Sequence, residues 1–241
     1  MLKSQCMLLC LCYFAVSCYG ANLAPFIEKC LWSDKACLVA STTKAIPYFA
    51  KGLPELGIAP MDPLKMSKVT LLEGDLSVEF TTMDVTGTSK AKVLNVERDL
   101  KKNLLKIEAE CPIDVIGHYE AKGKLFFVPI EGSGPFQVNC KNIHLEVDVE
   151  VTQTVGADGL KYWKIGKATH NYEVLEKATI NLENLFNGDM AKAQPILSIL
   201  NENWKEIMHS IARPIVDQIL DKIIEDIQIF ASKVPADQLE I

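Results

Sequence analysis

Two hydrophobic periodicities divide the chain into a strand-rich part and a helical part. From Ser67 to Asn184, apolar and polar residues alternate along several segments that are separated by turn residues. The clearest segment has an apolar residue at every second position: Ile143, Leu145, Val147, Val149 and Val151. Strict alternation is typical of antiparallel strands with one buried face. Because several segments reach about ten residues, against a usual five or six, we expect a long, strongly curved sheet.

The C-terminal part has the spacing of a helix. Between Met190 and Phe230, apolar residues recur every three or four positions: Ile196, Leu200, Trp204, Ile207, Ile211, Ile215, Ile219, Ile223 and Ile227. This predicts one helix of roughly 50–60 Å at about 1.5 Å per residue. Pro214 would kink it, because proline removes a backbone hydrogen bond. A coiled coil is the alternative, but the flanking charges are irregular.

These two parts together predict the fold class. The helix is apolar over more than the roughly 100° of a surface helix, so it needs to be enclosed. We expect an α+β domain in which the curved antiparallel sheet wraps the C-terminal helix. One helix and a wide sheet rarely fill all the space between them. The remaining volume would be an elongated apolar tunnel, as is typical of a lipophilic ligand site.

The segment before the sheet predicts short helices and a connection. Residues 25–50 have helical character, with Pro25 suited to a first turn and Asp34 to the N-cap of a second helix. The stretch from Gly52 to Pro63 contains three prolines and two glycines, which predicts an extended linker.

The first residues predict a secretory signal peptide. Lys3 gives a positive start, and the apolar run from Met7 to Val16 ends before an expected cleavage at Gly20–Ala21. A membrane anchor is the alternative, but the run is too short to span a bilayer. We therefore expect residues 1–20 to be removed. Residues 21–241 would form one secreted, extracellular domain with no integral membrane association.

The cysteines predict a disulfide near the N-terminus. Of eight cysteines, four follow residue 20: Cys30, Cys37, Cys111 and Cys140. An oxidising compartment favours disulfides. The short spacing of Cys30 and Cys37 suits a staple between the two helices; a zinc or redox site is the alternative, which the spacing and the scattered histidines disfavour. Cys111 and Cys140 are candidates for a second pair.

Charge and motifs argue against several function classes. With 25 Lys+Arg against 31 Asp+Glu, the net charge is −6, so we expect no nucleic-acid partner. An ester hydrolase would need G-x-S-x-G, and the nearest match, Gly132-Ser133-Gly134, is typical of a turn. The histidines lack metal-ligand spacing. A calcium site is disfavoured because strand alternation already explains Glu146, Asp148 and Glu150. We expect no enzyme activity, metal or cofactor.

Four residues are candidates for ligand contact. Phe126, Trp204 and Ile211 would line the tunnel or pack within the core. Tyr119 lies on a strand that we expect to face the helix, where its hydroxyl would orient the polar end of a ligand. The alternative is a core tyrosine whose hydroxyl bonds to the backbone, as buried hydroxyls commonly do.

Three stretches resemble the takeout/juvenile hormone-binding protein family of secreted insect proteins. They are CLWSDKAC (30–37), then GHY (117–119) with GKLFFVPI (123–130) and GSG (132–134), and finally LENLFNGD (182–189) with ILNENW (199–204) and Pro235. The resemblance implies a long helix wrapped by a curved sheet with an internal tunnel, and a bridge between Cys30 and Cys37. It also implies transport or sequestration of a lipophilic molecule such as juvenile hormone, another terpenoid or a fatty acid, and a connection with circadian rhythm.

The expected function is therefore that of a secreted, monomeric carrier of a small lipophilic ligand, for which a membrane receptor is a candidate partner. One alternative is a lipid-surface or receptor-docking protein with a vestigial cavity. A secreted esterase is a further alternative, which the absent motifs count against.

Overall fold

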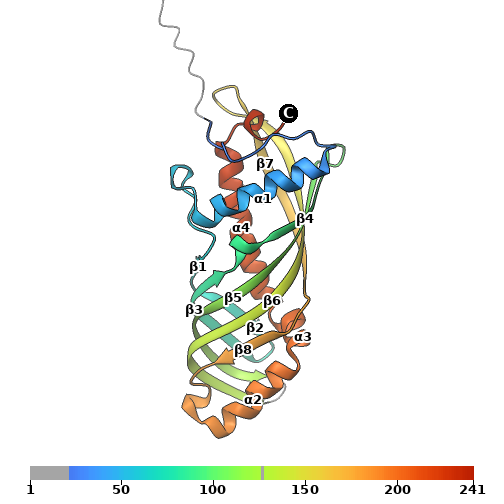
Figure 1. The fold of residues 1–241 in the computed structure, drawn as a ribbon. Helices are drawn as coiled ribbons and strands as arrows, with labels where there is room; N and C mark the ends of the chain where they lie inside the picture. Colours follow the sequence, from blue (N-terminus) through green and yellow to red (C-terminus); the bar gives the residue numbers. More distant parts are fainter. Residues whose placement is uncertain (1–21, 126–127) are drawn as a thin grey trace, which may run out of the picture.

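A long curved antiparallel sheet wraps around the last helix of the chain (Figure 1). The computed structural model describes residues 22–125 and 128–241. The expected signal peptide, residues 1–20, and Phe126 lie outside the described residues. Within the described part the sheet has eight strands: β1 (Leu64–Met66), β2 (Val69–Glu73), β3 (Leu76–Thr86), β4 (Lys92–Asp99), β5 (Leu104–Leu125), β6 (Val128–Val155), β7 (Lys161–Val174) and β8 (Ala178–Leu182).

Strands β5 and β6 run the length of the sheet. They have 22 and 28 residues, and their pairing extends from Leu104 opposite Glu150 to Leu125 opposite Val128. β3 and β4 pair with the outer edge of β5, and β7 and β8 with the outer edge of β6. Bulges interrupt the β3–β5, β4–β5, β5–β6 and β6–β7 pairings, and each bulge bends its strand. The predicted long, curved antiparallel sheet is thus confirmed.

The C-terminal part is helical, but the prediction of one continuous helix is wrong. It consists of α2 (Met190–Glu202), α3 (Trp204–Glu206), a π-helical turn (Ile207–Ile211) and α4 (Arg213–Lys233). Figure 1 shows α2 across one end of the sheet and α4 running through its interior toward the other end. With 21 residues, α4 spans about 31 Å.

Local bonding explains where the helix breaks. The side-chain amide of Asn203 donates to the carbonyl of Ile199 (2.8 Å) at the end of α2. The N–H of Ala212 then reaches five residues back to the carbonyl of Ile207 (2.8 Å), which widens the turn. Pro214 follows at the second position of α4, where its missing N–H costs no helical bond. The apolar residues keep the same spacing across the break, so the periodicity of the sequence does not reveal that the helix is interrupted.

Near the N-terminus, one of two expected helices is present. Helix α1 (Lys35–Lys51) begins at the predicted N-cap, where Asp34 accepts from the N–H of Cys37 (3.0 Å). The first expected helix is absent: residues 22–34 form turns and a bridge. The hydroxyl of Ser41 bonds both the N–H (2.9 Å) and the carbonyl (2.8 Å) of Glu28, so these backbone groups are not free for helical bonds.

The proline-rich stretch 52–63 folds into a compact turn, so the prediction of an extended linker is also wrong. It contains a short helical turn (Pro54–Leu56) and buries four apolar side chains against the C-terminal end of α4: Leu53, Leu56, Ile58 and Met61. Burial of these side chains favours the compact turn over an extended chain.

The cysteines form one disulfide among the described residues. Cys30 and Cys37 are bonded, with their Cα atoms 5.7 Å apart, as predicted. The candidate second pair is not formed: Cys111 and Cys140 are free thiols. They lie on β5 and β6 on either side of a bulge, where Cys111 is opposite Ile143 and Cys140 is opposite Ile113. Burial raises the pKa of each thiol to about 11.

Candidate functional site

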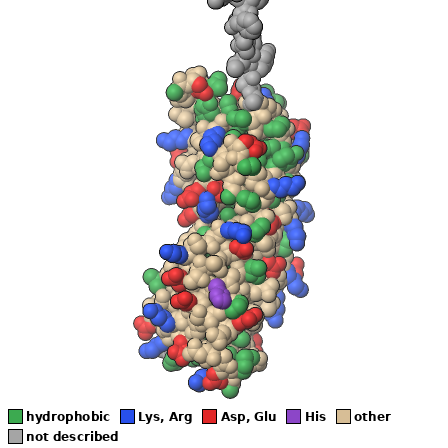
Figure 2. Space-filling model, turned by 90° about the vertical axis from the view of Figure 1, so that its left-hand side faces the viewer, with side chains coloured by type: hydrophobic (Ala, Val, Ile, Leu, Met, Phe, Trp, Pro, Cys, Tyr) green, Lys and Arg blue, Asp and Glu red, His purple; other side chains and the backbone are tan. Residues whose placement is uncertain are grey.

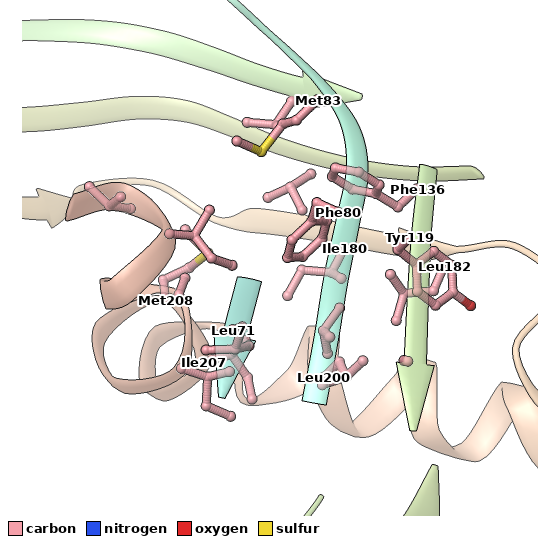
Figure 3. A pocket seen from close by; sticks show the side chains of 18 of the residues that line it. Leu71, Phe80, Met83, Tyr119, Phe136, Ile180, Leu182, Leu200, Ile207 and Met208 are labelled. Carbon is pink, nitrogen blue, oxygen red and sulfur yellow. The ribbon is translucent and has the colours of Figure 1, made fainter. Parts of the chain in front are cut away.

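An apolar cavity lies between α2, the start of α4 and the sheet. Its volume is about 180 Å³, and we call it the α2 cavity. Side chains from five strands, α2, α4 and the turn between the helices surround it; those labelled in Figure 3 are Leu71, Phe80, Met83, Tyr119, Phe136, Ile180, Leu182, Leu200, Ile207 and Met208. Inward-facing strand residues and the apolar stripe of the helices therefore meet there, as the alternation predicts.

A second cavity lies near the other end of α4, beneath α1. Its volume is about 360 Å³, and we call it the α1 cavity. Helix α1 contributes Leu38, Ser41, Thr42, Ala45 and Phe49 to its wall, and the opposite wall comes from β4 to β7. Ser41 is buried but its hydroxyl already bonds to Glu28, so the wall of this cavity is also largely apolar.

Helix α4 passes along both cavities. Ile215, Val216 and Ile219 line the α2 cavity, and the next residues on the same side, Leu220, Ile223, Ile224 and Ile227, line the α1 cavity. The two cavities thus follow one another along the helix that the sheet encloses. A helix with apolar residues over so much of its surface can contact the sheet and still border open space.

Tyr119 lines the α2 cavity with its ring, while its hydroxyl bonds to the backbone. The side chain is 1% exposed, and its hydroxyl donates to the carbonyl of Glu183 at 2.9 Å. In Figure 3 the oxygen points away from the side chains at the centre of the cavity. Burial raises the pKa of Tyr119 to about 12, so the hydroxyl is neutral. This arrangement corresponds to the alternative reading of a backbone-bonded core tyrosine.

The other candidate residues lie in different places. Ile211, in the π-helical turn, lines the α2 cavity, as does Tyr119. Trp204 does not: it is half-buried at the start of α3 and lines a separate pocket of about 170 Å³ with Tyr172, Lys205 and His209. The break after α2 turns Trp204 away from the stripe that its spacing suggested. Phe126 lies outside the described residues.

Sequence reasoning missed several aromatic and sulfur-containing lining residues. Phe80 and Phe136 contact each other edge to face in the α2 cavity, with ring centroids 4.8 Å apart, and Met83 and Met208 lie nearby. Phe80 is part of an alternating strand, so its inward direction was predictable. Its position opposite α2 depends on strand pairing between distant parts of the chain, which alternation does not reveal.

The segment Gly132-Ser133-Gly134 lies within the continuous strand β6, so the prediction of a turn is wrong. A Cβ at Gly134 would lie 2.6 Å from the carbonyl oxygen of Glu183, and one at Gly132 would lie 2.9 Å from the Cα of Leu185. These glycines therefore allow the chain after β8 to pass close to β6. Glycine is needed at these positions because of this close approach, and not because the chain turns there.

The remaining surface features concern metals, membranes and charge. Across residues 22–125 and 128–241, no three His, Cys, Asp or Glu side chains are grouped so that they could hold a metal ion. The same residues include no helix that is both long and apolar enough to cross a membrane. On the face drawn in Figure 2, basic and acidic side chains are interspersed, and neither sign forms a continuous patch.

Comparison with known proteins adds to this geometry. The model of the haemolymph juvenile hormone binding protein family matches residues 6–240. The chain belongs to this family. Its fold matches the crystal structure of Epiphyas postvittana Takeout 1 with a TM-score of 0.85 and 31% identity, over 89% of this chain and 99% of that one.

Two further relatives are more distant in sequence. The circadian clock-controlled protein daywake of Drosophila melanogaster is 24% identical over 198 residues, which is 75% of this chain and 74% of daywake. The juvenile hormone-binding protein of Manduca sexta is 26% identical over 165 residues, 64% of this chain and 68% of that protein. The resemblance noted in the sequence is thereby confirmed at the level of the family and the fold.

Proposed function

We propose that this protein is a secreted, non-enzymatic carrier that holds a small lipophilic ligand in the cavities along α4. The observation that carries the proposal is the pair of apolar cavities in line inside the sheet. A largely apolar, enclosed space is the usual form of a site for a hydrophobic small molecule. When a ligand longer than either cavity binds, the two would join into one tunnel along the helix.

The names of relatives support the same class of ligand. The matching family model and the Manduca sexta relative are named for binding juvenile hormone, and the structural match is to a takeout protein. We propose that a terpenoid, a fatty acid or a similar molecule is bound here. The carrier would be a monomer in the extracellular fluid, with a membrane receptor as a further partner.

The expected affinity follows from the area that such a ligand buries. A molecule of about twenty heavy atoms would bury about 400 Å² of apolar surface, which contributes roughly 10 kcal/mol. Association costs at least about 4 kcal/mol. The difference, about 6 kcal/mol at most, corresponds to a Kd of tens of micromolar, so tighter binding needs polar contacts as well.

Probe binding to a cavity-filling variant tests the proposal. Ala121 lines the α2 cavity, and Ala121→Phe would place a ring in it. Ala191→Phe is the matched control, because Ala191 is exposed on α2. We expect a fluorescent lipid probe to bind the native protein, Ala121→Phe to weaken binding by about tenfold or more, and Ala191→Phe to have no effect.

Mass spectrometry of the native protein and extraction with organic solvent complete the test. Release of a terpenoid or fatty ligand would support the carrier. A protein that takes up no probe and yields no ligand would rule it out. If such a protein nevertheless bound liposomes or a receptor, the docking alternative would replace it.

A further inference from the structure

Arg98 does not itself line the α1 cavity, but it lies next to residues that do, on the enclosed side of the sheet. Along β4 it is two residues after Val96, which lines that cavity, so the two side chains share a face. Its partner across the β4–β5 pairing is Leu105, which also lines the cavity. The Arg98 guanidinium lies over the ring of Trp32, another lining residue, at 5.8 Å.

The guanidinium has unused bonding capacity. One terminal nitrogen donates to the carbonyl of Val151 (2.7 Å) and the other to the carbonyl of Asp99 (3.3 Å). Its Nε atom is buried and has no hydrogen-bond partner. The ion pairs within the described part of the chain include Arg213 but not Arg98. A half-buried cation without a paired anion is unusual in a folded protein.

A second polar group lies at the same end of the cavity. The rings of Trp32 and Trp163, which both line it, are 5.7 Å apart. The indole N–H of Trp163 donates to the carboxylate of Glu240 at 3.2 Å. Burial lowers the pKa of Arg98, whereas the charges of Glu240 and Asp99 raise it, so both carboxylates act on the guanidinium from beyond ion-pair distance. One cation, an indole donor and the carboxylate of Glu240 therefore lie near the end of an otherwise apolar space.

The opposite end offers no such group. The α2 cavity is lined by apolar side chains, and the hydroxyl of Tyr119 is directed to Glu183. An ionised group placed there would lose its hydration without compensation. A ligand with one charged end could therefore lie along α4 in only one direction, with its charge toward Arg98.

We propose that the ligand is an aliphatic acid whose carboxylate binds beside Arg98 while its hydrocarbon chain extends along α4. Arginine suits this role because its fixed N–H groups match the oxygens of a carboxylate. The proposal rests on the carrier function above and adds the chemical class and the direction of the ligand. No bond is made or broken in this binding step.

A comparison of palmitate with methyl palmitate tests this inference, because the two share the hydrocarbon chain and differ at one end, where the acid is charged and the methyl ester is neutral. Each competes with a fluorescent lipid probe for the native protein, Arg98→Met and Arg213→Met. Arg213 is a matched control: it also lies over an aromatic ring, that of Tyr172 at 5.5 Å, but it is paired with Asp217 at 2.8 Å. Tyr172 lines neither cavity, whereas Trp32, the ring beside Arg98, lines the α1 cavity.

We expect the native protein to bind palmitate at least about tenfold more tightly than the ester. Arg98→Met should remove this preference and leave the ester affinity unchanged, whereas Arg213→Met should keep the preference. Glu240→Gln gives an independent check, because it removes the negative charge that competes near Arg98 and keeps an acceptor for Trp163. It should tighten palmitate binding and leave the ester unaffected.

Three results would overturn the inference. Equal affinity of the native protein for acid and ester would do so without any variant. Equal weakening of both ligands by Arg98→Met would show that Arg98 only stabilises the sheet. Probe binding with neither compound competing would exclude long-chain acids but leave the carrier function standing, whereas absence of probe binding would remove both.

Discussion

Replacing Tyr119 with phenylalanine separates a structural role of its hydroxyl from a role in ligand binding. The hydroxyl is enclosed and donates to the carbonyl of Glu183 at 2.9 Å. Tyr119→Phe removes this bond and keeps the ring that borders the α2 cavity. Because the hydroxyl points away from the cavity, we expect the affinity for a lipid probe to stay within about twofold of the native value.

Tyr119→Phe should instead lower the stability of the folded protein. Loss of a hydrogen bond costs about 0.5–1.5 kcal/mol, and a buried carbonyl left without a partner costs about 1–3 kcal/mol. Since Tyr119 is 1% exposed, water cannot easily replace the hydroxyl. We expect the free energy of unfolding to fall by about 1–2 kcal/mol. For a domain of this size this corresponds to a decrease in Tm of about 2–8 °C.

Urea unfolding followed by tryptophan fluorescence measures the free energy of unfolding, and titration with the lipid probe measures the affinity. Tyr48→Phe is the control, because Tyr48 is 45% exposed and stacks on Phe26. It should change neither quantity. Unchanged stability of Tyr119→Phe together with about tenfold weaker probe binding would refute this reasoning. It would show that the hydroxyl serves the ligand and not the fold.

Two further predictions concern the cysteines. Replacing both Cys30 and Cys37 with serine should lower the free energy of unfolding by about 2.5 kcal/mol, because the short loop they close is no longer restrained in the unfolded chain; urea unfolding measures this, and equal stability with and without the disulfide would contradict it. Cys111 and Cys140 should resist iodoacetamide at about pH 8, since burial raises their pKa values to about 11 and only a small fraction is thiolate. Mass spectrometry should detect labelling after unfolding, and rapid labelling of the native protein would show that the thiols are accessible.

Elements defined by local patterns could be predicted from the sequence. Alternation gave the strands of the sheet, Asp34 marked the start of α1, and the short spacing of Cys30 and Cys37 indicated their bond. Each of these depends on residues that are close in sequence. The fold class followed because a long apolar helix and a long half-apolar sheet have few ways to cover each other.

Features set by contacts between distant segments could not be predicted in the same way. The break between α2 and α4 preserves the spacing of Ile207, Ile211 and Ile215, so only the hydrogen bonds of Asn203 and Ala212 reveal it. The partner of the Tyr119 hydroxyl is a backbone carbonyl 64 positions later. Trp204 shares the helical spacing but lies in another pocket. Sequence periodicity gives a direction for each side chain, but not the surface it meets.

Helix α2 closes one end of the space that the sheet surrounds, and it is attached there by few polar bonds. The side chain of Asn201 bonds the N–H (2.9 Å) and the carbonyl (2.7 Å) of Ile180 on β8, much as a neighbouring strand would. The depth of the enclosed space therefore depends on a short helix that is joined to α4 through the π-helical turn. Changes in the length or angle of α2 would alter the maximum length of a ligand that the enclosed space can hold, while the pairing of the strands stays as it is.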